Sequence, residues 1–225
     1  MTLYDQILSL PMFQGLSRED LDNIVTHTKF DFSKVEPGLD IVRENTPCTH
    51  LRFLLSGTVV IHSRAVDNSY SVDEDVQAPA MFGLERLFGL TQYHGQSITA
   101  LTQCSLLNLR KDEIMTLADG HLIFRMNLFN RLATDTQKYS QLTWRRRPTT
   151  LVGGLLEFLS LHTSYPAGHK VLNIRMQTLA DEIGQSRLNV SRQLNAWKDS
   201  GLVALSRGRI DIPQLEKLLQ LKDCP

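Results

Sequence analysis

The stretch GQSRLNVSRQLNAWKDSGLV, residues 184–203, decides the fold of the C-terminal part of the chain, because it combines a turn, a helix start and a helix end. Gly184 permits the positive φ that a tight turn between two helices requires. Ser186 is a favourable N-cap, and Val190 and Leu194 recur at the spacing of one helix face. The stretch therefore predicts a turn followed by a helix with a polar N-terminal end.

A second predicted helix precedes this turn. In the segment MQTLADEIG, residues 176–184, Leu179, Ala180 and Ile183 share one face, and the small Ala180 lets the next helix approach closely. Two helices joined in this way form a helix-turn-helix, whose second helix places its N-terminal part in the major groove of DNA. The candidate DNA-contacting residues of that helix are Ser186, Arg187, Leu188, Asn189, Ser191 and Arg192.

A wing is predicted directly after the second helix. The alternating segment VALSRGRIDI turns at Gly208, as a hairpin does, with Arg207 and Arg209 at its tip as further candidate DNA contacts. Two alternatives stay open here. The helices form an ordinary packed pair with solvated arginines, or the winged helix serves protein–protein contact rather than DNA binding.

Charge is divided unevenly along the 225-residue chain, although its formal net charge is zero. Residues 144–225 contain 12 Lys and Arg against 7 Asp and Glu, a net charge of +5, which leaves 12 against 17, a net charge of −5, for residues 1–143. Phosphate contact requires a basic surface. The C-terminal part is therefore the candidate nucleic-acid-binding part.

Other function classes are not expected from the sequence. It has no glycine-rich phosphate loop, nucleophile elbow or metal-ligand spacing, so we predict no catalytic residue, no metal site and no enzyme activity. Cys48, Cys104 and Cys224 are far apart, which predicts reduced thiols in a cytoplasmic protein. The N-terminus lacks the basic region of a signal peptide and no apolar run approaches 18 residues, so no membrane partner is expected.

The region from residue 30 to residue 109 has the pattern of a β sandwich or roll. Two short helices precede it, the second capped by Ser17, with Asp20 three residues later in a near capping box. The predicted strands lie in FDFSKV (30–35), LDIVRE (39–44), HLRFLLSGTVVIHSRAV (50–66) and QSITALTQCSLLNL (96–109).

A long helix is predicted from residue 121 to residue 144, a run of 24 residues without Gly or Pro. One stripe has the spacing of heptad a and d positions and contains Leu122, Met126, Phe129 and Ala133. A second stripe on another face contains Leu128, Leu132, Tyr139 and Leu142. Two stripes indicate two neighbours, the β domain and a partner subunit, so the first stripe is the candidate interface of a homodimer. A long helix in a monomer core is the alternative.

The order of these parts resembles the CRP/FNR family of bacterial transcription regulators over almost the whole chain. LPMFQGLSREDLDNI is similar to the family's N-terminal helices, EPGLDIVRENTPCTHLRFLLSGTVVIHSR to its β roll, and SRLNVSRQLNAWKDSGLV to its recognition helix. The resemblance implies an α+β fold: an N-terminal cyclic-nucleotide-binding-like β roll (a double-stranded jelly roll), a long dimerisation helix and a C-terminal winged helix-turn-helix. The implied domains are a sensor at 1–117, a dimerisation helix and hinge at 118–146, and a DNA-binding domain at 147–225.

The resemblance also implies partners. They are a second copy of the chain, a double-stranded DNA operator, a signal received by the β roll, and RNA polymerase if the protein is an activator. A glutamate is common in the family at the position of Leu188, which offers only apolar contact, for example to a thymine methyl group. Arg192 keeps the base-reading arginine position and suits guanine, and Asn189 suits adenine or a phosphate. The operator is therefore expected to differ from the family's familiar consensus.

The candidate effector pocket departs from the cyclic-AMP-binding members, in which a glutamate holds the ribose and an arginine holds the cyclic phosphate. In MFGLERLFGLTQYHGQSITA, residues 81–100, Leu84 takes the glutamate position and His94 the arginine position. Leucine accepts no hydrogen bond and histidine is not a permanently charged bidentate donor, so cyclic AMP is not expected to bind. The effector stays unidentified, and its candidate pocket is Phe82, Gly83, Leu84, Glu85, Arg86, His94, Ser97 and Thr99.

Two further sensing modes of the family depend on residues that can be sought in the sequence. Iron–sulfur members carry a cysteine cluster near the N-terminus, and no cysteine precedes Cys48, so an iron–sulfur cluster is not expected. Haem-sensing members bind iron through residues such as histidine. Haem stays an open alternative, because the sequence offers histidines that could bind its iron. They are scattered along the chain: His27, His50, His62, His94 and His121.

Overall fold

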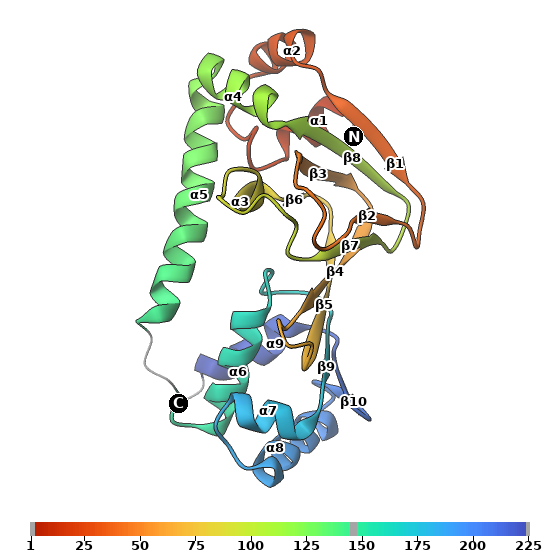
Figure 1. The fold of residues 1–225 in the computed structure, drawn as a ribbon, viewed down its shortest axis with the longest axis vertical. Coiled ribbons are helices and arrows are strands. Elements are labelled where there is room, and N and C mark those ends of the chain that lie inside the picture. The colour runs from red at the N-terminus through yellow and green to blue at the C-terminus, as the bar shows by residue number, and fades with distance from the viewer. Residues whose placement is uncertain (1–2, 145–147, 224–225) are drawn as a thin grey trace. The chain divides into compact units, whose positions relative to one another are not determined.

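The computed structural model describes residues 3–144 and 148–223, which form two compact units (Figure 1). The first consists of Met1–Val59 and Gln77–Thr143, and the second of Val60–Val76 and Trp144–Pro225. The predicted α+β fold class is confirmed, with a β roll and a long helix followed by a C-terminal winged helix-turn-helix. The division by role at 1–117, 118–146 and 147–225 stays a prediction, and residues 145–147 lie outside the described residues.

The first unit contains the β roll. One antiparallel sheet has the strand order β1-β8-β3-β6, and β2 pairs with β7. The elements of this unit are α1 (Leu3–Leu8), α2 (Arg18–His27), β1 (Asp31–Val35), β2 (Asp40–Val42), β3 (His50–Ser56), the start of β4 (Thr58–Arg64), β6 (Ala80–Phe82), α3 (Leu84–Leu87), β7 (Ser97–Ala100), β8 (Cys104–Arg110), α4 (Lys111–Gly120) and α5 (Leu122–Thr143).

The N-terminal helices are fixed to the roll by a cap and a shared aromatic core. The predicted capping box is present: Ser17 Oγ accepts from the Asp20 N–H at 3.0 Å, and the Asp20 carboxylate accepts from the Ser17 N–H at 3.1 Å. Phe13 lies edge-on to Phe53 of β3 and Phe124 of α5. Helices, sheet and long helix therefore share one core.

The long helix α5 has one buried and one exposed apolar stripe. Phe124 and Leu128 are buried in the core of the first unit, and Leu132 packs against that core. Leu122 and Phe129 are 62% and 56% exposed, and Met126 and Ala133 are exposed with them. The predicted stripe Leu122, Met126, Phe129 and Ala133 is thus not part of this core. The side chains of Tyr139 and Leu142, from the second stripe, lie outside the described residues.

The second unit is a winged helix-turn-helix that includes a hairpin from earlier in the chain. Its sheet has the strand order β10-β11-β9-β5, so β5 extends the sheet of the wing. The elements are the rest of β4, β5 (Tyr70–Gln77), α6 (Leu151–His162), β9 (Lys170–Ile174), α7 (Met176–Glu182), α8 (Arg187–Asp199), β10 (Ala204–Ser206), β11 (Arg209–Ile212), α9 (Leu215–Leu219) and the 3₁₀ helix η1 (Gln220–Asp223).

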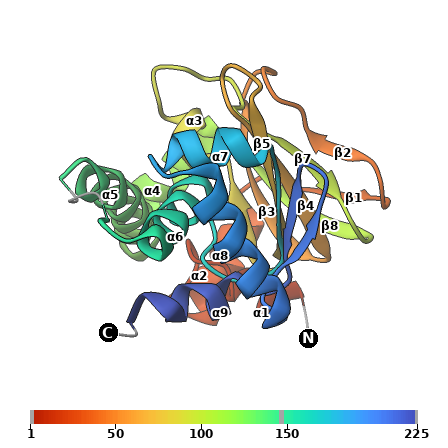
Figure 2. The ribbon, with the colours of Figure 1, turned by 90° about the horizontal axis from the view of Figure 1, so that it is seen from below.

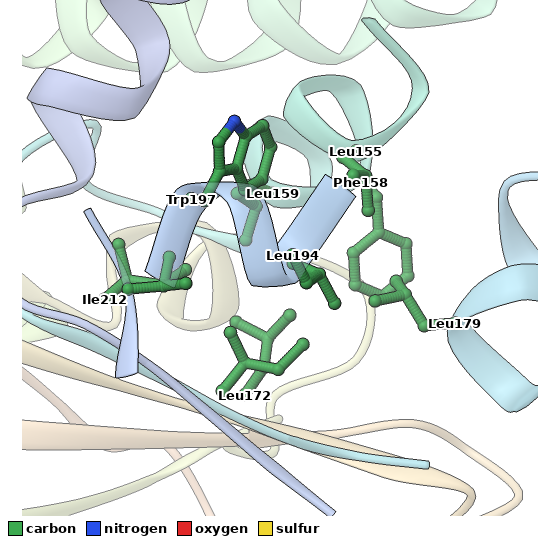
Figure 3. Close-up of a pocket in the computed structure, with 10 residues that line it drawn as sticks. Leu155, Phe158, Leu159, Leu172, Leu179, Leu194, Trp197 and Ile212 are labelled. Carbon is green, nitrogen blue, oxygen red and sulfur yellow. The ribbon is translucent and has the colours of Figure 1, made fainter. Parts of the chain in front are cut away.

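The core of the second unit holds α8 in place. Figure 3 shows Leu194 and Trp197 of α8 facing side chains from α6, α7, β9 and β11. The cavity among them has a volume of about 10 Å³ and an entirely apolar lining. That space holds at most one water molecule, so it is a small packing gap rather than a ligand site. Within the described residues, no helix has the length and apolar character needed to cross a membrane.

Candidate nucleic-acid interface and sensor site

The turn between α7 and α8 is built by Gly184 and its neighbours. Gly184 has a φ of +65°, the left-handed conformation predicted for it. The Gln185 N–H donates to the Ala180 carbonyl at 2.9 Å, which closes the turn over the end of α7. Ser186 then caps α8, because its side chain accepts from the Asn189 N–H at 3.2 Å. Figure 2 shows α7 and α8 as neighbouring helices that run in different directions.

Helix α8 separates an apolar inner face from a polar outer face. Val190, Leu194 and Trp197 are buried, as predicted. Leu188 is 60% exposed, and this large apolar side chain is left in water at the start of the helix. The remaining candidate DNA contacts on α8 are exposed, except Ser191, which is half-buried: Ser186, Arg187, Asn189 and Arg192.

The wing presents one free and one paired arginine. Gly208, with a φ of +72°, makes the turn between β10 and β11, and Arg207 and Arg209 flank it on exposed positions. Arg209 Nη2 lies 3.2 Å from Asp211 Oδ2, so its charge is partly balanced. Within residues 3–144 and 148–223, Arg187, Arg192 and Arg207 have no ion pair. Three unpaired guanidinium groups on α8 and the wing form a cationic surface.

Sequence reasoning missed the contact between the hairpin β4–β5 and the wing sheet. Glu74 of β5 lies opposite Lys170 of β9, and both side chains are fully buried, with Nζ and Oε2 3.4 Å apart. The Glu74 carboxylate also accepts from the backbone N–H groups of Ser164 and Tyr165. The signal was present, because Glu74 stands where the alternation of β5 places apolar residues.

A histidine reinforces this contact near the protein surface. His169 Nδ1 lies 2.9 Å from Asp75 Oδ2 of β5, and its Nε2 lies 3.1 Å from Asp211 Oδ1 of β11. Partial burial works against the charged ring, but the two carboxylates outweigh it and raise the pKa of His169. His169 therefore links the hairpin to β11 through Asp211, the residue that also pairs with Arg209.

The structure separates the candidate effector residues into three groups. Leu84 is buried in the core of the first unit, and Phe82 is also buried. Ser97 Oγ accepts from the Glu44 N–H at 3.0 Å, and Thr99 Oγ1 donates to Asp40 at 3.0 Å, so both hold β7 to the segment around β2. Gly83 lies against the imidazole of His94, and the charge of Arg86 acts on the same ring. Glu85 is an exposed residue whose carboxylate lies 4.0 Å from Arg86.

His94 lies in a cationic setting that sequence reasoning did not identify. Arg52 Nη1 of β3 is 3.5 Å from His94 Nε2. Burial and the charges of Arg52 and Arg86 lower the pKa of His94 to about 4. The buried thiol of Cys48 is close to the same group, and burial raises its pKa. The only sequence signal was an arginine inside the apolar strand HLRFLL.

The haem alternative and the cysteine prediction remain untested. Cys48 and Cys104 are free and buried, while Cys224 lies outside the described residues. In the part of the chain that the structure describes, no three His, Cys, Asp or Glu side chains are grouped to hold a metal ion. His62 contacts Asp73 at 2.9 Å, and His50 lies beside the Arg52 cluster.

Two family models match the two halves of the chain. A cyclic nucleotide-binding domain matches residues 32–121, and a Crp-like helix-turn-helix domain matches residues 152–221. The two matches follow the order of the β roll and the winged helix-turn-helix.

Solved structures share this fold. The Catabolite Activator Protein of Thermus thermophilus is 23% identical over 93% of this chain and 96% of its own, with a TM-score of 0.50. The sensor domain of the transcriptional regulator DNR from Pseudomonas aeruginosa is 16% identical over 65% of this chain and 95% of its own, with a TM-score of 0.51. No curated protein sequence matches the chain.

Proposed function

The chain belongs to the CRP/FNR family of DNA-binding transcription regulators, and we propose that it acts as a homodimer that reads a two-fold symmetric operator. The observation that carries the proposal is the cationic surface of α8 and the wing. Arg187, Arg192 and Arg207 are exposed and have no ion pair within the described residues. Arginines in this state are free to contact phosphates and guanine edges.

The roles within this surface differ by position. Arg192 lies on the outer face of α8 and is assigned to a guanine, where a bidentate contact is worth about 1–3 kcal/mol of discrimination. Arg207 on the wing is assigned to a phosphate. Arg209 contributes less, because Asp211 already shares its charge. Leu188 gives an apolar contact at a neighbouring base.

A binding-site selection experiment tests this assignment. Arg192→Ala should lose affinity for the selected operator far more than for random DNA. Arg207→Ala is the matched control, because it should weaken binding to all sequences about equally. It should also reduce the slope of log binding constant against log salt concentration by about one. Leu188→Glu should shift the preference toward cytosine. If all three variants bind DNA as the wild type does, these residues are not the DNA contacts. If the wild type itself selects no DNA sequence, the winged helix serves protein–protein contact instead.

The exposed stripe of α5 supports the homodimer. Leu122, Met126 and Phe129 would leave water in a helix-to-helix contact between two copies, as heptad positions do. Phe129→Asp would bury a charge at this contact and should produce a monomer in light scattering. Asn130→Asp, which adds the same charge one residue later, should leave the dimer intact. Equal masses for both variants would contradict this interface.

The β roll is assigned the sensing role, and an activator of this design would contact RNA polymerase. Cyclic AMP is not expected to be the signal, because Leu84 is buried in the core and offers no acceptor to a ribose. Calorimetry with cyclic AMP should therefore show no binding in the micromolar range. Micromolar binding would assign the nucleotide to Glu85 and Arg86 instead.

A further inference from the structure

The wing arginine Arg209 shares its counter-ion with a histidine. Arg209 Nη2 lies 3.2 Å from Asp211 Oδ2, and His169 Nε2 lies 3.1 Å from Asp211 Oδ1. Arg209 and Asp211 stand two residues apart on β11, so their side chains lie on the same face of the strand. His169 directly precedes β9, the strand that pairs with β11. One carboxylate thus holds the arginine at one oxygen and the histidine at the other.

The imidazole of His169 is held in place by β5 as well as by β11. Its Nδ1 lies 2.9 Å from Asp75 Oδ2, and the Asp75 N–H donates to the His169 carbonyl at 3.1 Å. The His169 side chain is 36% exposed, so it exchanges protons with solvent. The ring therefore gains and loses its charge at a fixed position between two carboxylates.

The other charged groups next to His169 already have partners. Glu216 of α9 accepts from the Gly168 N–H at 2.8 Å. Lys170 is fully buried with Glu74 of β5. Partial burial works against the charged ring, but the two carboxylates that face it outweigh this effect and raise the pKa of His169. These two carboxylates are therefore the groups that respond to protonation of the ring.

Protonation of His169 changes how strongly Asp211 holds Arg209. A neutral imidazole donates through one nitrogen, whereas a charged imidazole donates through both and brings a positive charge to Asp211. The attraction of the Asp211 carboxylate for Arg209 is then weaker. Asp73 of β5 also attracts Arg209, but its carboxylate is held by His62 at 2.9 Å, and within the described residues it forms no ion pair with Arg209.

We propose that His169 determines, through Asp211, how freely Arg209 binds a phosphate of DNA, so that protonation of His169 strengthens DNA binding. The proposal rests on the proposed function of the wing, and it makes His169 and Asp211 positioning residues rather than DNA contacts. DNA binding should weaken as the pH rises through the folded pKa of His169, because the neutral ring leaves the Asp211 charge to Arg209. The change is limited to about fivefold, the factor that a partly exposed ion pair can supply.

An NMR titration of the His169 ring in the full-length protein tests this link without DNA. Arg209→Gln should raise the pKa of His169 further, because Asp211 then keeps one cationic partner instead of two. Arg207→Gln is the matched control, since it removes the same charge from the same wing but Arg207 has no ion pair within the described residues. It should shift the pKa of His169 less. Equal shifts in the two variants, or no shift in Arg209→Gln, would overturn the proposal.

Binding to a mixed-sequence DNA duplex at pH 6 and pH 9, at constant ionic strength, tests the consequence for DNA. The loss of affinity from pH 6 to pH 9 should be smaller in His169→Gln and in Arg209→Gln than in the wild type, by up to about fivefold. The double variant should reduce the loss no further than either single variant, because both act through one contact. His62→Gln is the control, since His62 pairs with Asp73 instead, and it should keep the wild-type loss.

The two experiments separate this proposal from the proposed function. Arg209 is 48% exposed, so Arg209→Gln keeps the test valid if His169→Gln disturbs folding. If Arg209→Gln retains the full wild-type loss, His169 attracts DNA by its own charge and the proposal is wrong. It is also wrong if His62→Gln reduces the loss as much as His169→Gln. If the wild type binds no duplex at either pH, the proposed DNA binding fails, and the NMR titration still decides whether His169 and Arg209 are linked.

Discussion

His94 in the first unit and His169 in the second have opposite electrostatic surroundings. Burial and two arginines lower the pKa of His94 to about 4. Two carboxylates, Asp75 and Asp211, raise the pKa of His169 in spite of its partial burial. The second cluster contains its own counter-charges, whereas in the first, within the described residues, only the exposed Glu85 lies near an arginine, 4.0 Å from Arg86. The difference indicates that the carboxylates of the second cluster fasten parts of one unit together, whereas the arginines of the first keep His94 neutral.

Breaking the pair Glu74–Lys170 should cause the largest change in the free energy of unfolding, because both side chains are fully buried. Glu74→Gln would leave Lys170 charged and fully buried without its partner, which costs about 3–5 kcal/mol of the free energy of unfolding. Urea unfolding measures the loss, and Glu182→Gln at an exposed position is the control. A double replacement, Glu74→Leu with Lys170→Met, should recover part of the stability, because the Ser164 and Tyr165 N–H groups still lose the carboxylate that accepts from them. A loss below about 1 kcal/mol for Glu74→Gln, the range of exposed pairs, would show that the pair is not enclosed.

Protonation of His94 should cause the next largest change in the free energy of unfolding. The unfolded chain takes up this proton below the ordinary pKa of 6.5, but the folded chain does so only near pH 4. Stability is therefore lost as the pH falls from 6.5 to 4, by about 3 kcal/mol. His94→Asn should lose less stability than the wild type between pH 7 and pH 4. If the free energy of unfolding depends on pH identically in the two proteins, the pKa of His94 is not lowered in the folded chain.

A third histidine, His162, is held by hydrogen bonds rather than by charge. Its Nδ1 lies 2.7 Å from the Phe158 carbonyl, so Nε2 accepts, and the Tyr70 hydroxyl lies 2.8 Å from it. Tyr70→Phe should lower the free energy of unfolding by about 0.5–1.5 kcal/mol. Tyr93→Phe, at an exposed position, should have no effect. Equal losses in the two variants would mean that this hydrogen bond does not help to hold the hairpin.

Local signals made much of the fold predictable. The cap at Ser17, the turn at Gly184 and the buried face of α8 each depend on residues within a few positions of one another, and all three are present. The cluster at Arg52 and the pair Glu74–Lys170 were not predicted, because their partners are distant in sequence. Alternation explains that Glu74 points inward, but nothing local shows that a lysine 96 residues later lies opposite.

The smallest effect is expected at His169, where the ion pairs are partly exposed. A raised folded pKa means that His169 contributes stability below its unfolded pKa of 6.5, and that this contribution is lost as the pH rises through the folded pKa. The charged groups facing the ring are Asp75 of β5 and Asp211 of β11, and Arg209 shares Asp211. His169→Asn should therefore cost more stability at pH 6 than at pH 9, by less than about 1 kcal/mol because solvent screens such pairs. The difference between wild type and variant, measured by urea unfolding at both pH values, isolates this histidine from the other six. If the loss of stability in His169→Asn grows toward pH 9, the pKa of His169 is not raised in the folded chain. The two histidines would then no longer differ in the direction of their pKa shifts.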